Sequence, residues 1–82
     1  MRTAEQYIAA LGGAENITAV AGRITRVRVD VRTPESVQVE QLREIGAIGV
    51  VVQRDAVQLI VGAGADDLAA EIRAVLGVEL VE

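Results

Sequence analysis

The chain has 82 residues, of which 51% are apolar and only Tyr7 is aromatic; twelve acidic and eight basic side chains give a formal net charge of −4. A chain of this length can bury one core, so we expect a single domain over residues 1–82 with its core at about residues 3–77. The sequence contains no Cys and no His, which excludes disulfides, thiol nucleophiles and imidazole acid–base or phosphocarrier chemistry.

The composition also limits the partners and the location. An excess of acidic residues argues against binding of duplex nucleic acid, whose affinity for proteins comes mainly from neutralised phosphates. No apolar run approaches the roughly 18 residues that span a bilayer, so we expect a cytoplasmic protein without direct membrane insertion. The glutamates Glu35, Glu40 and Glu44 lack a metal-ligand spacing, and we expect neither a metal nor a cofactor.

The first predicted element is a helix. Thr3 and Gln6 form a capping box, and Gly12-Gly13 supplies a stop. Between them the apolar residues repeat at helical spacing: Ala4, Ile8 and Leu11. We expect the side chain of Tyr7 at the rim of the core, with its hydroxyl in water.

Two strands are predicted next. Residues 17–20 are β-favouring, and residues 25–31 alternate strictly between apolar and polar side chains, so we expect two strands joined near residues 21–24. The valines of the second strand share one face: Val27, Val29 and Val31. The charged residues share the other: Arg26, Arg28 and Asp30.

The second half of the chain repeats this order. Thr33-Pro34 ends the strand, and a short amphipathic helix then ends at Gly46. Residues 49–53 and 57–61 are β-branched runs, predicted to form a hairpin although residues 54–56 lack an Asn-Gly or Asp-Gly turn. A last amphipathic helix follows, with these apolar positions: Ala65, Leu68, Ile72, Val75 and Leu76.

The element order αββαββα predicts an α/β protein of the α+β sandwich type. We expect a four-stranded, mainly antiparallel sheet covered on one face by three helices, with the other face polar. Residues 78–82 are expected to form a frayed tail.

Six local strings extend over most of the chain: Ala4-Glu5-Gln6, Ala10-Leu11-Gly12-Gly13, Glu15-Asn16-Ile17, Leu42-Arg43-Glu44-Ile45-Gly46-Ala47-Ile48-Gly49-Val50-Val51, Val57-Gln58-Leu59-Ile60-Val61-Gly62 and Asp66-Asp67-Leu68. In this order they resemble the IIB domain of the glucose and N-acetylglucosamine family of the phosphoenolpyruvate-dependent sugar phosphotransferase system. Because fold-level likeness does not establish function, the site residues decide what the chain can do.

The resemblance places a phosphate-carrying cysteine at the bend between the first two strands, where this chain has Arg23. The family signature is a cysteine followed by Ile or Ala and then Thr-Arg-Leu-Arg, and the corresponding segment here runs from Gly22 to Arg28. The resemblance implies phosphate binding by five residues: Arg23, Thr25, Arg26, Arg28 and Gln58. It implies partner docking by Gly22 and Ile24, and as partners a IIA phosphocarrier and a IIC membrane permease that holds the sugar.

Replacement of the cysteine by Arg23 removes the nucleophile. A guanidinium stays protonated and has no lone pair to attack phosphorus, so Arg23 can bind a phosphate but not relay it. The hydroxyls of Thr25 and Thr18 lack a histidine as base and are poor substitutes. We therefore expect no catalytic residue and no phosphoryl transfer by this chain.

Three alternatives remain open from the sequence. The chain is a IIB component in a cysteine-replaced state, a native cysteine-less IIB paralogue that docks partners or a regulator, or an unrelated small regulatory α/β domain. Arg26 and Arg28 would also alternate with valines on any solvated strand face, and Arg23 alone is a common kind of loop-tip residue. The resemblance implies that sugar specificity lies in the membrane partner and that the domain sits at the inner face of the membrane through it.

Overall fold

The computed structural model of the chain describes residues 4–77. Its helices are α1 (Ala4–Ala10), α2 (Val39–Glu44) and α3 (Ala65–Leu76), and two short 3₁₀ helices are η1 (Ala14–Asn16) and η2 (Pro34–Ser36). The strands are β1 (Ile17–Arg23), β2 (Arg26–Val31), β3 (Gly49–Val52) and β4 (Ala56–Ile60). Thr3 of the predicted capping box and the predicted tail lie outside the described residues.

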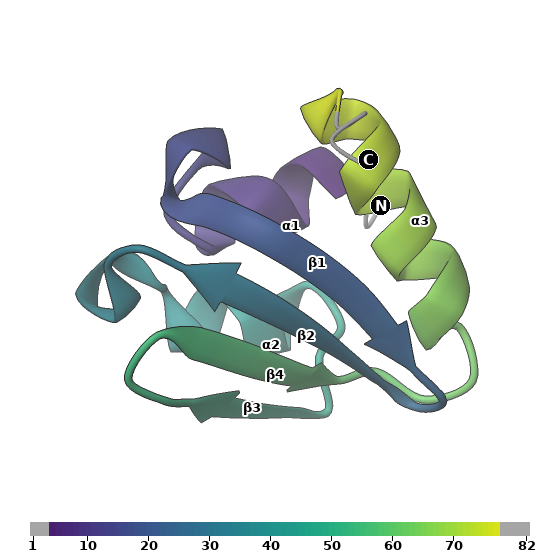
Figure 1. Cartoon of the computed structure of the whole chain (residues 1–82). Helices are drawn as coiled ribbons and strands as arrows, with labels where there is room; N and C mark the ends of the chain where they lie inside the picture. Colours follow the sequence, from purple (N-terminus) through teal and green to yellow (C-terminus); the bar gives the residue numbers. More distant parts are fainter. Residues whose placement is uncertain (1–3, 78–82) are drawn as a thin grey trace.

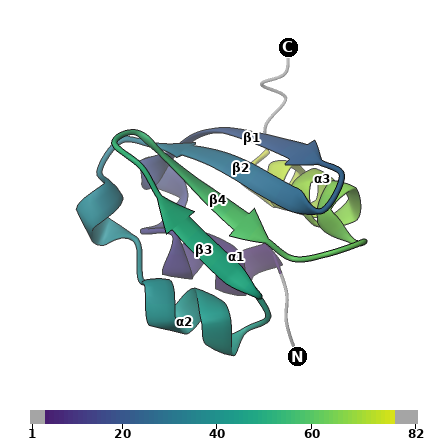
Figure 2. The ribbon, with the colours of Figure 1, turned by 90° about the horizontal axis from the view of Figure 1, so that it is seen from below.

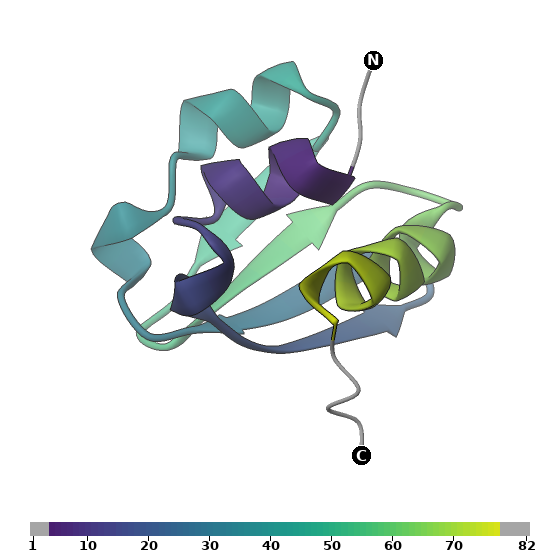
Figure 3. The same ribbon diagram turned by 90° about the horizontal axis from the view of Figure 1, so that it is seen from above.

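The four strands form one sheet in the order β1-β2-β4-β3, and every neighbouring pair is antiparallel. Figure 2 shows the strands nearest the viewer with α1 and α3 behind them, and Figure 3 shows the same helices in front of the sheet. The predicted α+β sandwich with one helix-covered face is therefore confirmed. Among residues 4–77, no helix is long and apolar enough to cross a membrane.

The core forms where the pleat turns alternate side chains toward the helices. Val27, Val29, Val57 and Leu59 are completely buried on this face. They pack against fully buried side chains of α3, of α2 and of the residue after α1: Ala65, Ala69, Ile72, Leu42 and Leu11. Arg26, Arg28 and Gln58 consequently lie on the opposite, open face of the sheet, as the alternation in β2 predicts.

The end of α1 is set by two glycines and by a buried asparagine. Gly12 and Gly13 have φ angles of +104° and +98°, and the Gly13 N–H donates to the Ile8 carbonyl at 2.9 Å, which closes the helix. The Asn16 amide donates to the Leu11 carbonyl at 2.8 Å, and its oxygen accepts from the Thr33 N–H at 2.7 Å. Asn16 thus joins the end of α1 to the segment that follows β2.

Two predictions need correction. The bend between the first strands comprises Ile24 and Thr25, not residues 21–24, because β1 stays paired with β2 as far as the Arg23–Arg26 pair. The hydroxyl of Tyr7 does not reach water. Tyr7 is only 5% exposed, and its hydroxyl donates to the Ile45 carbonyl at 3.3 Å, linking α1 to the end of α2.

Candidate functional site: a cationic hollow at the β1–β2 bend

The bend between β1 and β2 projects from one end of the sheet (Figure 1). Ile24 and Thr25 make the connection, and the Thr25 carbonyl accepts hydrogen bonds from the N–H groups of Val61 and Gly62, both at 3.0 Å. These two bonds fasten the bend to the chain that leaves β4. Ile24, at the tip, is 83% exposed and has a positive φ of 58°.

An open hollow of about 430 Å³ lies beside this bend. Six residues line it: Arg23, Ile24, Thr25, Arg26, Arg28 and Gln58. The five residues predicted to bind phosphate are thus neighbours in space. Gln58 joins them because β4 lies beside β2, where Gln58 is the register partner of Arg28.

Gly22 does not line the hollow, although it was predicted to dock a partner together with Ile24. It is the register partner of the buried Val27, which places it on the helix side of the sheet. A Cβ atom at Gly22 would lie 2.5 Å from Asp66 Oδ1 and 3.0 Å from Asp66 Cα. The absence of a side chain therefore lets the first turn of α3 approach β1, and a docking role for Gly22 stays a prediction.

Hydrogen bonds orient two of the three arginines that line the hollow. Arg26 donates from Nη1 to Gln58 Oε1 at 3.0 Å, and Gln58 donates from Nε2 to Gln53 Oε1 at 3.4 Å. Arg28 donates from Nε to Asp30 Oδ1 at 3.0 Å, a half-exposed ion pair that contributes little to stability. Neither Gln53 nor Asp30 was among the predicted site residues, since both act by holding a neighbour.

The positive charge of this end is only partly compensated. Ion pairs within residues 4–77 join Arg28 to Asp30 and Arg43 to Glu40, so Arg23 and Arg26 have no acidic partner in that part of the chain. Guanidinium groups bind phosphate and carboxylate oxygens through directed hydrogen bonds. The hollow can therefore hold an oxyanion, although the whole chain carries a net charge of −4.

The hollow lacks an activated nucleophile among its six lining residues. Thr25 supplies their single hydroxyl, and the chain has neither a histidine to activate it nor a cysteine to replace it. No group of acidic residues within residues 4–77 could hold a metal ion. The chemistry that these side chains offer is anion binding.

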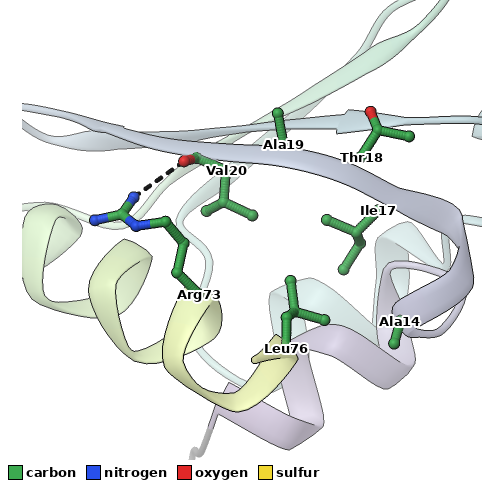
Figure 4. Close-up of a pocket in the computed structure, with 7 residues that line it drawn as sticks. All are labelled: Ala14, Ile17, Thr18, Ala19, Val20, Arg73 and Leu76. Carbon is green, nitrogen blue, oxygen red and sulfur yellow. Dashed lines mark hydrogen bonds between the residues drawn. The ribbon is translucent and has the colours of Figure 1, made fainter. Parts of the chain in front are cut away.

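A second hollow of about 360 Å³ lies between β1 and the last turns of α3. Figure 4 shows apolar side chains such as Ile17, Val20 and Leu76 facing it, with Arg73 at one side. Arg73 donates from Nη1 to the Val20 carbonyl at 3.0 Å, so this cation is engaged with the backbone of the edge strand. No sequence pattern indicates this contact, which depends on how α3 crosses β1.

Comparisons with known proteins converge on one family. A family model described as phosphotransferase system, EIIB matches residues 5–38. The PTS system N-acetylglucosamine-specific EIIB component of Streptomyces coelicolor is 45% identical over 69 residues, which make up 84% of this chain and 90% of that protein.

Two further relatives are longer proteins. The N-acetylglucosamine-specific EIICBA component of Klebsiella pneumoniae is 38% identical over 89% of this chain, and the matched part is 11% of that protein. The MurNAc-GlcNAc-specific EIIBC component of Staphylococcus aureus is 39% identical over 74% of this chain and 13% of that protein.

A solved structure confirms the fold. The crystal structure of one domain of the PTS system IIabc component from Clostridium difficile superposes with a TM-score of 0.72. It covers 93% of this chain and 77% of that one, at 23% sequence identity.

Proposed function

The chain belongs to the EIIB family of the phosphotransferase system, and on that premise we propose that it docks its phosphocarrier partner at the β1–β2 bend without accepting the phosphoryl group. The observation that carries this proposal is that Arg23 lines the hollow, in the position where the family resemblance implies a cysteine. Membership of the family also removes the alternative of an unrelated regulatory domain.

The chemical argument concerns the bond that the phosphoryl group would form to this chain. The family resemblance implies that the P–N bond of a phosphohistidine on IIA breaks while a P–S bond forms to the cysteine, whose thiol proton is lost. Arg23 cannot form the new bond, because its nitrogens carry a delocalised positive charge and no available lone pair. Arg26 and Arg28 would still attract the phosphoryl oxygens, so binding and transfer are separated in this chain.

The names of the relatives support a proposal for the partners and for the sugar. Klebsiella pneumoniae has an EIICBA component and Staphylococcus aureus an EIIBC component, which supports IIA-type and IIC-type partners for this chain. The relatives from Streptomyces coelicolor and Klebsiella pneumoniae are named N-acetylglucosamine-specific, so we propose a permease partner for this class of sugar. Docking to such a permease would place the domain at the inner face of the membrane.

Intact-mass spectrometry after incubation with phosphorylated IIA tests the proposal directly. We expect no added phosphoryl group on the chain as it stands and a measurable fraction of phosphorylated protein for Arg23→Cys. Arg23→Ser is the matched control: it opens the same space but supplies a hydroxyl without a base, and we expect no transfer to it.

Two outcomes would change the proposal. Phosphorylation of the chain as it stands would contradict the blocking role of Arg23. A folded Arg23→Cys variant that binds IIA but stays unphosphorylated would show that more than the nucleophile is missing. The second candidate, a native cysteine-less paralogue that acts by docking IIA, IIC or a regulator, would then replace a IIB relay component that lacks only its cysteine.

A further inference from the structure

The two most exposed large apolar side chains of residues 4–77 lie at the same end of the molecule. Ile24 is 83% exposed at the β1–β2 bend, and Ile48 is 74% exposed directly before β3. We propose that Ile48 is a second apolar anchor for the partner that docks at the bend, and that this partner presents an apolar surface around a central anion. The inference rests on the proposed docking function and extends its contact area.

Hydrogen bonds on both sides of the end of β4 fix the relative position of the two isoleucines. The Ile48 N–H donates to the Ile60 carbonyl at 2.7 Å, and the Val61 N–H donates to the Thr25 carbonyl at 3.0 Å. Thr25 and Ile48 therefore lie two strand spacings apart, about 10 Å. Figure 1 shows β1 and β4 ending, and β3 beginning, at this end of the sheet.

The backbone that carries Ile48 is anchored on both sides. The preceding residue, Ala47, is buried, and its N–H donates to the Leu42 carbonyl at 2.9 Å, which closes the end of α2. The following residue, Gly49, begins β3 and is the register partner of Ile60. Ile48 thus keeps a large apolar side chain in solvent on a well-connected backbone.

The charges between the anchors indicate the kind of surface that fits. Arg26 and Gly49, which follow Thr25 and Ile48 in the chain, are both register partners of Ile60. Arg23 is the register partner of Arg26, and neither arginine has an acidic partner within the described residues. A complementary surface buries the two isoleucines and supplies an anion to the arginines. On the proposed function, that anion is the phosphoryl group of phosphorylated IIA.

A titration of the whole chain with phosphorylated IIA tests the role of Ile48. We expect Ile48→Ser to raise the Kd at least tenfold, which corresponds to about 1.4 kcal/mol. Ile48→Met keeps an apolar side chain and should bind within about twofold of the unmodified chain. Val75→Ser is the matched control, because Val75 is 46% exposed near the C-terminal end of α3, away from the bend, and its replacement should leave the Kd unchanged.

The outcomes separate this inference from the function on which it rests. If the unmodified chain binds phosphorylated IIA and Ile48→Ser binds equally well, the second anchor is wrong and docking at the bend stands. If the unmodified chain does not bind, both fail. An Ile48→Ser variant that loses only its binding to the IIC permease would overturn the assignment of the anchor to IIA. Circular dichroism spectra that match the unmodified chain exclude misfolding as the cause of weaker binding.

Discussion

Ile24 combines a costly backbone conformation with an exposed apolar side chain. Its φ of +58° lies in the left-handed region, where a β-branched residue is destabilised by roughly 1–2 kcal/mol. Two-residue hairpin connections with positive φ usually contain Asn or Gly. The presence of a strained isoleucine at this tip, where it is 83% exposed, agrees with a binding role for its side chain.

Replacement of Ile24 by Asn should therefore stabilise the fold while weakening docking. We expect Ile24→Asn to raise the free energy of unfolding by about 0.5–1 kcal/mol, because Asn tolerates the left-handed conformation and little buried apolar area is lost. Urea denaturation measures the change. Ile48→Asn is the control: Ile48 is similarly exposed but has no positive φ, so no gain is expected there. Equal stability changes for the two variants would contradict the strain at Ile24.

Local periodicity predicted the sheet face of two of the expected site residues, whereas Arg23, Thr25 and Gln58 were expected from the family resemblance alone. Arg26 and Arg28 lie on the open face because strand alternation is a property of the segment itself. The buried hydroxyl of Tyr7 and the contact of Gly22 with Asp66 could not be predicted in this way. Both depend on how helices pack against residues far away in the sequence, which a local pattern does not encode.

At the scale of elements, β1 packs against the first turn of α3 on the helix side of the sheet, directly before the β1–β2 bend. Gly22 allows this approach, since its missing Cβ atom would lie 3.0 Å from the Asp66 Cα, a backbone atom of α3 that cannot rotate away. The next residue of β1 is Arg23. The position of α3 therefore affects Arg23, the residue on which the proposed function depends.

Substitution of two glycines can measure this packing. We expect Gly22→Ala to lower the free energy of unfolding by about 1–3 kcal/mol, because the added methyl group pushes α3 away from β1. Gly64→Ala adds the same group at the start of α3. There the new Cβ atom would meet no heavy atom within 4 Å apart from its chain neighbours, and φ is −90°. There the change should stay below about 0.5 kcal/mol, since lower entropy of the unfolded chain and poorer capping oppose each other. Similar losses in the two variants, measured in urea, would argue against close packing at Gly22.

The boundaries of the elements show that pairing between strands extends a strand beyond its β-favouring residues. The β-favouring run of the first strand ends at Val20, yet β1 continues through Ala21, Gly22 and Arg23 because each of these has a register partner in β2. The two 3₁₀ helices, η1 and η2, were not predicted. They are single turns, too short to show an apolar repeat.

At the scale of the whole molecule, one hydrophobic cluster joins the elements of the fold. Its buried members come from all three α-helices and from β1, β2 and β4, while Val50 of β3 is partly buried against it. Tyr7 belongs to this cluster and is hydrogen-bonded to Ile45 after α2. No second core is present among residues 4–77, so no element can retain its packing when the cluster opens.

This shared core predicts a single cooperative unfolding transition, which the sole aromatic residue can report. Tyr7 is 5% exposed, so its fluorescence follows the core, whereas far-ultraviolet circular dichroism follows the backbone. We expect the two signals to give the same urea midpoint and a free energy of unfolding of about 4–12 kcal/mol, as is usual for a domain of this length. Tyr7→Phe is a control for the hydroxyl: it should lower the midpoint modestly and leave the transition two-state when followed by circular dichroism. Different midpoints for the two signals in the unmodified chain would mean that part of the sheet unfolds separately from the core.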